Sequence, residues 1–299
     1  MTVFENLFEI RNNCPICLKS NPKILLSNNL SEPKFKKFID DYYNHLVDER
    51  VIEKGKFELA QCLRCDFVWQ RHILNKDLLY KLYSQWINPR QSLLKHLKSQ
   101  SKLIVLFGLS LQIKLMLFLI NDINQPKVLD YGCGWGRWCL MAQIAGCDVY
   151  AFDIVSGRRM FVSSKGIKLF NWNDNNQIEF DFINIEQVLE HVSDPKTFLN
   201  KISSILKSGG VVTISVPKRL TKKQLKETPA KNSVQPLEHI NCFEPSNLEF
   251  LAKEADLEIL KINLSLLHLL KSFKLDNLVL AFYCVYFYSR TQRIYLRKN

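Results

Sequence analysis

Residues 127–146 read KVLDYGCGWGRWCLMAQIAG, and this stretch decides the fold. The apolar pair at 128–129 predicts a short buried strand, and the glycine-rich turn from Asp130 to Gly136 lets the backbone approach a ligand closely. Apolar residues then recur at helical spacing as far as Gly146, which suits the end of a helix. Because the start of that helix points free N–H groups into the turn, the stretch predicts a strand, a ligand-binding turn and a helix.

The spacing of the glycines distinguishes two kinds of nucleotide-binding turn. A dinucleotide fingerprint G-x-G-x-x-G starting at Gly132 needs a third glycine at position 137, where this chain has Arg137. The chain instead has D-x-G-x-G-x-G, formed by Asp130, Gly132, Gly134 and Gly136. This pattern resembles motif I of the class I S-adenosylmethionine-dependent methyltransferases, in which the glycines let the methionine part of the cofactor lie against the turn. Taken alone, the pattern also fits a tight turn that binds no ligand.

Three further segments follow in the order that this family has. Residues 148–153, DVYAFD, predict a second strand ending in Asp153, whose carboxylate either accepts hydrogen bonds from ribose hydroxyls or caps the next helix. Residues 180–195, FDFINIEQVLEHVSDP, predict a strand, a loop and the start of a helix that the glycines at 209–210 end. Residues 211–217, VVTISVP, predict another buried strand.

The resemblance covers roughly residues 120–265, and it implies an α/β fold. The expected fold is a seven-stranded Rossmann-like methyltransferase sheet with helices on both faces. The residues that the resemblance and their positions assign to S-adenosyl-L-methionine are Asp130, Gly132, Gly134, Gly136, Asp153, Asp174 and Glu190. Of these, Asp174 is assigned to the adenine only by its position after the predicted third strand at 167–172, and Asn173 is the alternative.

Two Glu-His pairs are candidates for the chemistry. His191 with Glu190 follows the strand at 180–186, and His239 with Glu238 opens the segment that should fold over the substrate. In the nucleotide-sugar methyltransferases that this sequence resembles, the histidine of such a pair is a candidate general base. An unshifted imidazole titrates near pH 6.5, which suits that role. We therefore predict His239 first, with Glu238, and His191 second; the alternative for each histidine is a structural hydrogen bond that fixes a loop.

Four cysteines near the N-terminus form the second strong pattern. Cys14 and Cys17 make one C-x-x-C turn, and Cys62 and Cys65 make another after 44 intervening residues. Two such turns supply four sulfur ligands for a tetrahedral Zn²⁺ site, which is closed to substrate and therefore structural. A thioredoxin-like redox pair is the alternative, but neither motif starts a helix of such a unit. The arrangement of a zinc ribbon before the catalytic domain is similar to that in several sugar and nucleotide-sugar methyltransferases.

Length and composition predict the domain organisation and the compartment. We expect a zinc-ribbon-like domain at 1–75, a helical linker or substrate cap at 76–124 and the cofactor-binding domain at 125–299. The first twelve residues carry two glutamates and no sustained apolar run, so no secretory signal is expected. Nine cysteines without such a signal indicate a reducing compartment, and we predict a cytoplasmic protein.

Apolar and basic segments leave open whether the protein contacts a membrane. The run at 103–120 is apolar but interrupted by Lys114, so we expect a buried or substrate-covering helix, with a membrane-interface helix as the alternative. The C-terminal run at 278–289 suits either a strand of an antiparallel pair or a docking helix. The formal net charge of the protein is +12, and six of its Lys and Arg residues lie at 218–231. A basic loop there would bind a diphosphate, RNA or an anionic lipid; the alternative is a solvated loop that binds nothing.

The leading hypothesis is a methyltransferase that uses S-adenosyl-L-methionine and acts on a sugar, nucleotide-sugar or glycan precursor. The alternatives are a methyltransferase for a membrane-borne quinone or lipid, with peripheral contact at the inner face of the membrane, or for RNA. A non-catalytic binding protein with the same fold is the alternative from another class. The sequence identifies neither the acceptor atom nor the oligomeric state.

Overall fold

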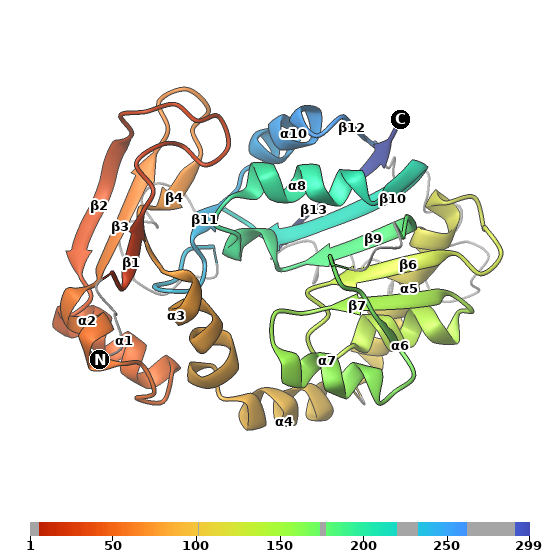
Figure 1. Ribbon diagram of the computed structural model, residues 1–299, viewed down its shortest axis with the longest axis horizontal. Helices are drawn as coiled ribbons and strands as arrows, with labels where there is room; N and C mark the ends of the chain where they lie inside the picture. The colour runs from red at the N-terminus through yellow and green to blue at the C-terminus, as the bar shows by residue number, and fades with distance from the viewer. Residues whose placement is uncertain (1–5, 101, 174–177, 220–232, 262–290) are drawn as a thin grey trace.

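Two sheets organise the chain (Figure 1). The computed structural model describes residues 6–100, 102–173, 178–219, 233–261 and 291–299. The larger sheet has seven strands and occupies the C-terminal part, and a four-stranded sheet lies in the N-terminal part. Asp174, most of the basic loop and the apolar run at 278–289 lie outside the described residues.

The seven-stranded sheet confirms the predicted α/β fold. Its strands are β6 (Lys127–Tyr131), β7 (Asp148–Phe152), β8 (Lys168–Leu169), β9 (Phe180–Glu186), β10 (Leu206–Pro217), β12 (Leu257–Ile259) and β13 (Thr291–Lys298). They lie in the order β12-β13-β10-β9-β6-β7-β8, and β13 runs antiparallel to both of its neighbours while the other pairs are parallel. The strand order reverses beside β6, and ligands bind outside the carboxyl ends of the strands at such a point.

Helices cover both faces of this sheet. Those on one face are α5 (Leu103–Leu119), α6 (Arg137–Ile144) and α7 (Ser156–Ser163), and those on the other are α8 (Pro195–Ser204) and α10 (Pro245–Glu254). Val128 packs in the core under α5 to α7, whereas Leu129 packs in the core under α8 and α10. This alternation follows from the two-residue period of a strand, and it buries β6 on both sides.

The N-terminal part is built around the second sheet and its own apolar core. The elements here are β1 (Phe8–Ile10), β2 (Lys23–Asn29), α1 (Pro33–Tyr42), α2 (Glu49–Lys54), β3 (Lys56–Gln61), β4 (Val68–Gln70) and β5 (His72–Leu74). The sheet order is β11-β4-β3-β2, and its edge strand β11 (Asn241–Cys242) comes from far along the chain. Asn241 pairs with Trp69, and Cys242 pairs with Val68. A segment inside the predicted cofactor-binding domain therefore completes the N-terminal sheet.

Helices connect the two parts. They are α3 (Lys76–Lys81), the π-helical turn η1 (Leu82–Trp86) and α4 (Pro89–Gln100), and they lead into α5. The expected burial of the apolar run at 103–120 is confirmed for part of α5, where Leu111, Ile113 and Met116 are buried. Within the described residues no single helix is long and apolar enough to cross a membrane, although α4 and α5, bent by 88°, satisfy that test as a pair by length and composition alone.

The glycine pair at 209–210 does not end a helix, so that prediction was wrong. Helix α8 ends at Ser204, and β10 begins at Leu206. Leu206 already pairs with Phe180, and the glycines lie in the register irregularity between Leu206 and Val211. The physical reason is that the buried Leu206 joins the sheet before the glycines are reached, so they accommodate a bulge.

Candidate functional site

The glycine turn after β6 has three glycines with three different surroundings. All three have positive φ, at 85° for Gly132, 54° for Gly134 and 76° for Gly136. A Cβ on Gly132 would lie 2.3 Å from Val188 Cγ2, and one on Gly136 would lie 2.6 Å from Val162 Cγ1. A Cβ on Gly134 would meet nothing within 4 Å. Two glycines therefore allow close packing, and Gly134 leaves an open space beside the backbone.

Asp153 closes the other side of this turn. The backbone N–H of Gly134 donates to its Oδ2 at 3.0 Å, and the N–H of Val155 donates to its Oδ1 at 2.9 Å. Arg158 Nη1 lies 3.5 Å from Oδ2, and Asp153 is only 3% exposed. Asp153 thus holds the turn to the segment just before α7, and its carboxylate lies beside the open space at Gly134. The alternative prediction, that Asp153 caps this helix, was wrong, because the N-cap residue of α7 is Val155 and no side-chain capping hydrogen bond is made there.

Asp130 is a buried carboxyl group at the end of β6. Asn184 Nδ2 donates to its Oδ1 at 2.8 Å, and Cys139 Sγ donates to its Oδ2 at 3.2 Å. Burial raises the pKa of Asp130 to about 7, against the opposing effect of these two hydrogen bonds. The Oδ1 of Asn184 is itself buried and accepts no hydrogen bond from the described residues, so it can serve a donor on a ligand.

A cavity of about 910 Å³ opens from the glycine turn. Its walls combine this turn with α4, α5 and the end of α1, and the volume suits a cofactor or small-molecule ligand. The lining residues are Asp41, Tyr42, Asn44, Ile87, Asn88, Gln91, Ser92, Lys95, His96, Val105, Gly108, Leu109, Gln112, Asp130, Gly132, Cys133, Gly134, Trp135, Arg137, Trp138, Arg158, Asn184 and Glu186. The predicted cofactor residues Asp130, Gly132 and Gly134 line the cavity, whereas Gly136 and Asp153 are not among its lining residues.

The two Glu-His pairs lie close together, which the sequence analysis did not predict, and none of these four residues lines the cavity. Glu190 and His191 lie in the 3₁₀ turn η2 (Leu189–His191), directly after β9, and His239 lies just before β11. The rings of His191 and His239 are 4.7 Å apart between centroids, nearly perpendicular at 76°. Glu190, predicted as a cofactor contact, lies with the histidines instead of in the cavity wall.

Comparison with known proteins identifies the family. A family model described as "Methyltransferase domain" matches residues 91–262, which is more than half of the 299 residues. This chain belongs to that family. The methyltransferase domain so defined contains the glycine turn, both Glu-His pairs and most of the large sheet.

Curated relatives match over shorter lengths. A ubiquinone biosynthesis O-methyltransferase of Bradyrhizobium sp. (strain ORS 278) is 30% identical over 111 residues, covering 33% of this chain and 43% of the relative. A protein of the same name from Idiomarina loihiensis is 29% identical over 170 residues, covering 50% and 69%. The chain spans about half the length of the curated relatives that it matches.

A solved S-adenosylmethionine-dependent methyltransferase from Clostridium acetobutylicum aligns over 69% of this chain and 98% of its own, with 16% identity and a TM-score of 0.48. The YcgJ protein of Bacillus subtilis aligns over 64% and 98%, with 15% identity and a TM-score of 0.47.

Glu238 is a further titratable residue close to His191 and His239. Gln235 Nε2 donates to its Oε2 at 2.7 Å, and Tyr43 Oη lies 3.5 Å from the same oxygen. Burial raises the pKa of Glu238 to about 7. Burial, with the neighbouring His239, lowers the pKa of His191 to about 3, so His191 is neutral at pH 7. These shifts make Glu238 a better proton acceptor near neutral pH than His191.

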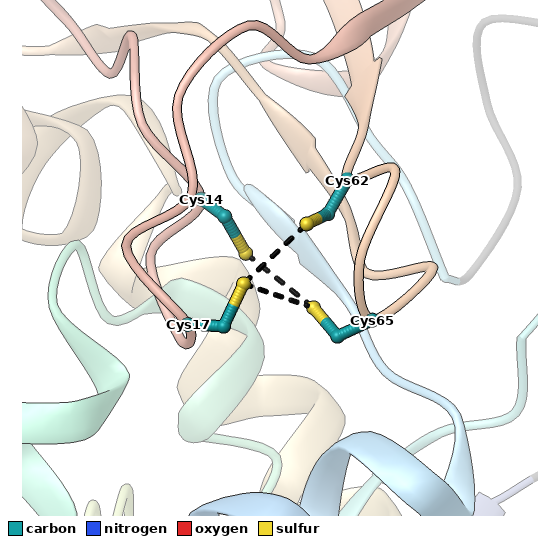
Figure 2. A group of neighbouring side chains, drawn as sticks. All are labelled: Cys14, Cys17, Cys62 and Cys65. Atoms are coloured by element: carbon teal, nitrogen blue, oxygen red, sulfur yellow. Dashed lines mark hydrogen bonds between the residues drawn. The ribbon is translucent and has the colours of Figure 1, made fainter.

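The four N-terminal cysteines gather before the methyltransferase domain, as the spacing predicts (Figure 2). Their sulfur atoms point toward one another, with separations of 3.6 Å for Cys14 and Cys65, 3.4 Å for Cys17 and Cys62, and 3.5 Å for Cys17 and Cys65. Four sulfurs about 2.3 Å from a tetrahedral Zn²⁺ would be about 3.8 Å apart. The donor set therefore fits zinc with almost no movement.

The sequence prediction missed several residues of this region. Asn184 is a polar residue between Ile183 and Ile185 in the buried strand β9, and that position was the available signal. Gln70 and Tyr83 carry no motif, yet Gln70 Nε2 donates to the carbonyl oxygens of Gln235 and His239 at 2.6 and 2.8 Å. Tyr83 Oη lies 2.9 Å from His191 Nδ1.

Proposed function

We propose that this protein transfers the methyl group of S-adenosyl-L-methionine to a small-molecule acceptor. The observation that carries the proposal is the open space at Gly134, which lies beside the Asp153 carboxylate at a cavity reaching toward the N-terminal part. The glycine turn and Asp153 would hold the cofactor, and Asn184 offers a polar group of the ligand an amide oxygen that accepts from no described residue. The bound cofactor supplies an already activated methyl group, so the protein must mainly bind and orient the acceptor.

Removal of a proton from the acceptor is assigned to the Glu-His region. Glu238, with a pKa of about 7, and His239 are the candidate proton acceptors. Tyr43 and Gln235 hold the Glu238 carboxylate, and Gln70 holds the backbone of His239. His191, which is neutral at pH 7, positions this region through the contact of its Nδ1 with the Glu238 carbonyl oxygen at 2.9 Å.

For the acceptor, we propose a sugar or nucleotide-linked sugar. Polar side chains dominate the part of the cavity wall that does not belong to the glycine turn, and Asp41, Asn44, Asn88 and Gln91 are among them. Such groups suit hydroxyl-rich ligands, which need many hydrogen-bond partners. A quinone precursor is the second candidate, because relatives carrying the name ubiquinone biosynthesis O-methyltransferase match part of this chain.

Calorimetry and activity assays test these proposals in order. Titration with S-adenosylhomocysteine should give a measurable heat, and no heat at high micromolar ligand would support a non-catalytic binding protein instead. Formation of S-adenosylhomocysteine is then followed with a panel of nucleotide-sugars, hydroxylated quinone precursors and bulk RNA. Turnover with quinone precursors alone would reject the sugar proposal, and turnover with RNA that falls steeply with salt would favour nucleic acid.

We also propose that the cysteine cluster holds a structural Zn²⁺. The support is the sulfur separation of 3.4 to 3.6 Å and the matching geometry of the two turns. In each turn the residue four positions after the first cysteine has positive φ, at 60° for Leu18 and 54° for Asp66. All four ligands come from the protein, so the metal has no open position for substrate.

A further inference from the structure

Glu190, His191 and His239 form a second group of metal-binding side chains, separate from the cysteine cluster. One ligand atom from each residue lies within 4.8 Å of the others. Glu190 and His191 are adjacent in η2, and His239 comes from the loop before β11. The group therefore joins the carboxyl end of β9 to the segment that completes the N-terminal sheet.

Glu190 is the residue that requires a partner. It is 0% exposed, and neither of its carboxylate oxygens accepts a hydrogen bond from the described residues. His191 Nε2 lies 3.9 Å from Oε1. A buried carboxylate without donors is strongly unfavourable, so Glu190 either takes up a proton or coordinates a cation.

His191 is oriented in the way that metal-binding histidines usually are. Its Nδ1 lies 2.9 Å from the carbonyl oxygen of Glu238 and 2.9 Å from Tyr83 Oη. With the Nδ1 proton donated to the carbonyl oxygen, the lone pair belongs to Nε2, the atom that faces Glu190. A backbone carbonyl that accepts from the remote ring nitrogen fixes both the tautomer and the ring orientation of a ligand histidine.

We propose that Glu190, His191 and His239 bind a divalent transition-metal ion such as Zn²⁺. Two imidazoles and one carboxylate are a donor set that such ions favour. Ligand atoms about 2.0 to 2.1 Å from a tetrahedral ion lie about 3.3 Å apart, so the present 3.9 Å between Glu190 and His191 must shorten slightly on binding.

These three protein ligands leave a coordination position for water or for an oxygen of the acceptor. An imidazole bound to the metal cannot also accept a proton, so in the metal-bound protein Glu238 is the remaining candidate proton acceptor. His239 is partly exposed, and 18% of the His191 side chain is exposed, so the group is accessible from one side. The part of the inference that concerns the acceptor rests on the proposed methyl transfer, whereas metal binding itself does not.

Metal content of the full-length protein provides the test. Protein saturated with Zn²⁺ and then dialysed should contain two ions per chain by mass spectrometry, one at the cysteines and one at this group. Glu190→Gln and His239→Asn should each reduce the content to one ion. The matched control is His45→Asn, because 76% of the His45 side chain is exposed and its backbone has a φ of 56°, which asparagine tolerates. This control should retain two ions.

A spectrum of the wild-type protein tests the proposal without any variant. Cobalt(II) at one equivalent should occupy the cysteine cluster and give strong thiolate-to-metal bands. A second equivalent should add weaker visible bands of a nitrogen and oxygen site without new thiolate intensity. The proposal is overturned by a single ion per chain, by a second ion that Glu190→Gln retains in folded protein, or by a second cobalt spectrum with thiolate bands. Neither measurement depends on methyl transfer, so failure here leaves the proposed enzyme intact.

Discussion

Gln70 Nε2 donates a hydrogen bond to the carbonyl oxygen of His239 at 2.8 Å, although 169 residues separate them in the chain. The backbone N–H of Gln70 also donates to the carbonyl oxygen of Ile240 at 2.9 Å, and Arg11 Nη2 donates to the same oxygen at 2.7 Å. Strand β4 of the N-terminal sheet thus holds the loop that carries Glu238 and His239. The N-terminal part, which also carries the cysteine cluster, therefore positions the backbone beside the candidate proton acceptors.

Gln70→Leu should lower kcat by about tenfold or more, because it removes the side-chain donor that joins the carbonyl oxygens of Gln235 and His239 to β4. Gln70 is a positioning residue that does not line the cavity, so the dissociation constant for S-adenosylhomocysteine should stay within about twofold of wild type. Steady-state kinetics and calorimetry measure the two effects.

The matched control for this experiment is Gln61→Leu. Gln61 is also buried, on the neighbouring strand β3, and its side chain donates to Asp66 at 2.9 Å instead of to the loop. The Gln61→Leu variant should be less stable than the wild-type protein but should keep its kcat. Equal losses of kcat in both variants would show that general destabilisation, and not the position of the loop, explains the result.

Gly134→Ala should weaken S-adenosylhomocysteine binding by about tenfold or more, because its methyl group would enter the open space where the ligand is expected. The left-handed backbone adds a stability cost of about 1 to 2 kcal/mol. Gly146→Ala is the matched control, since Gly146 has a φ of 86°, a Cβ there would also meet nothing within 4 Å, and the residue does not line the cavity. Both variants should unfold at similarly reduced temperatures, but only Gly134→Ala should lose affinity; unchanged affinity would place the cofactor elsewhere.

The sequence predicted the parts of this site that depend on local patterns. The turn with Gly132, Gly134 and Gly136, and the acid at Asp153, follow from spacing within about 25 residues, and a strand-turn-helix unit needs no distant partner to be recognised. The cysteine cluster was predictable although its halves are far apart, because two C-x-x-C motifs together are the usual ligand pattern of a four-sulfur metal site.

The remaining features depend on contacts between distant parts of the chain. Gln70 is one polar residue in a three-residue strand, and nothing near it indicates that it meets His239. Strand β11 has two residues, too few for a period to be seen. The glycines at 209–210 misled the prediction because glycine indicates backbone freedom, and a bulge uses that freedom as readily as a helix end does.

Loss of the Zn²⁺ proposed at the cysteines should destabilise the large sheet and its helices as well as the N-terminal part. Cys17 and Cys65 pack against the same apolar core as α8 and α10, and Asn247 Nδ2 of α10 donates to the Cys65 carbonyl oxygen at 2.8 Å. Cys65→Ser should lower the zinc content by one ion per chain and the thermal midpoint by several degrees. Cys147→Ser, which alters a buried cysteine outside the cluster, should retain the metal. Full zinc content in Cys65→Ser would refute the assignment of this ligand.

The buried carboxyl group of Asp130 should make stability depend on pH. Its pKa is raised from 3.8 to about 7 by burial, so the folded protein binds this proton more tightly than the unfolded chain does. The resulting stability is fully present below pH 3.8 and is lost as the pH rises through about 7. Between pH 5 and 8 the contribution to the free energy of unfolding should fall by about 2 to 3 kcal/mol.

Asp130→Asn isolates this contribution, because asparagine keeps an oxygen that can accept from Asn184 Nδ2 but does not titrate. Urea unfolding of both proteins at several pH values gives the difference in unfolding free energy. Relative to wild type, the variant should become progressively more stable as the pH increases from 5 to 8, since Glu190 and Glu238 titrate in both proteins and cancel. A difference that does not change with pH would mean that Asp130 is ionised throughout, held by a charge or donor other than Asn184 and Cys139.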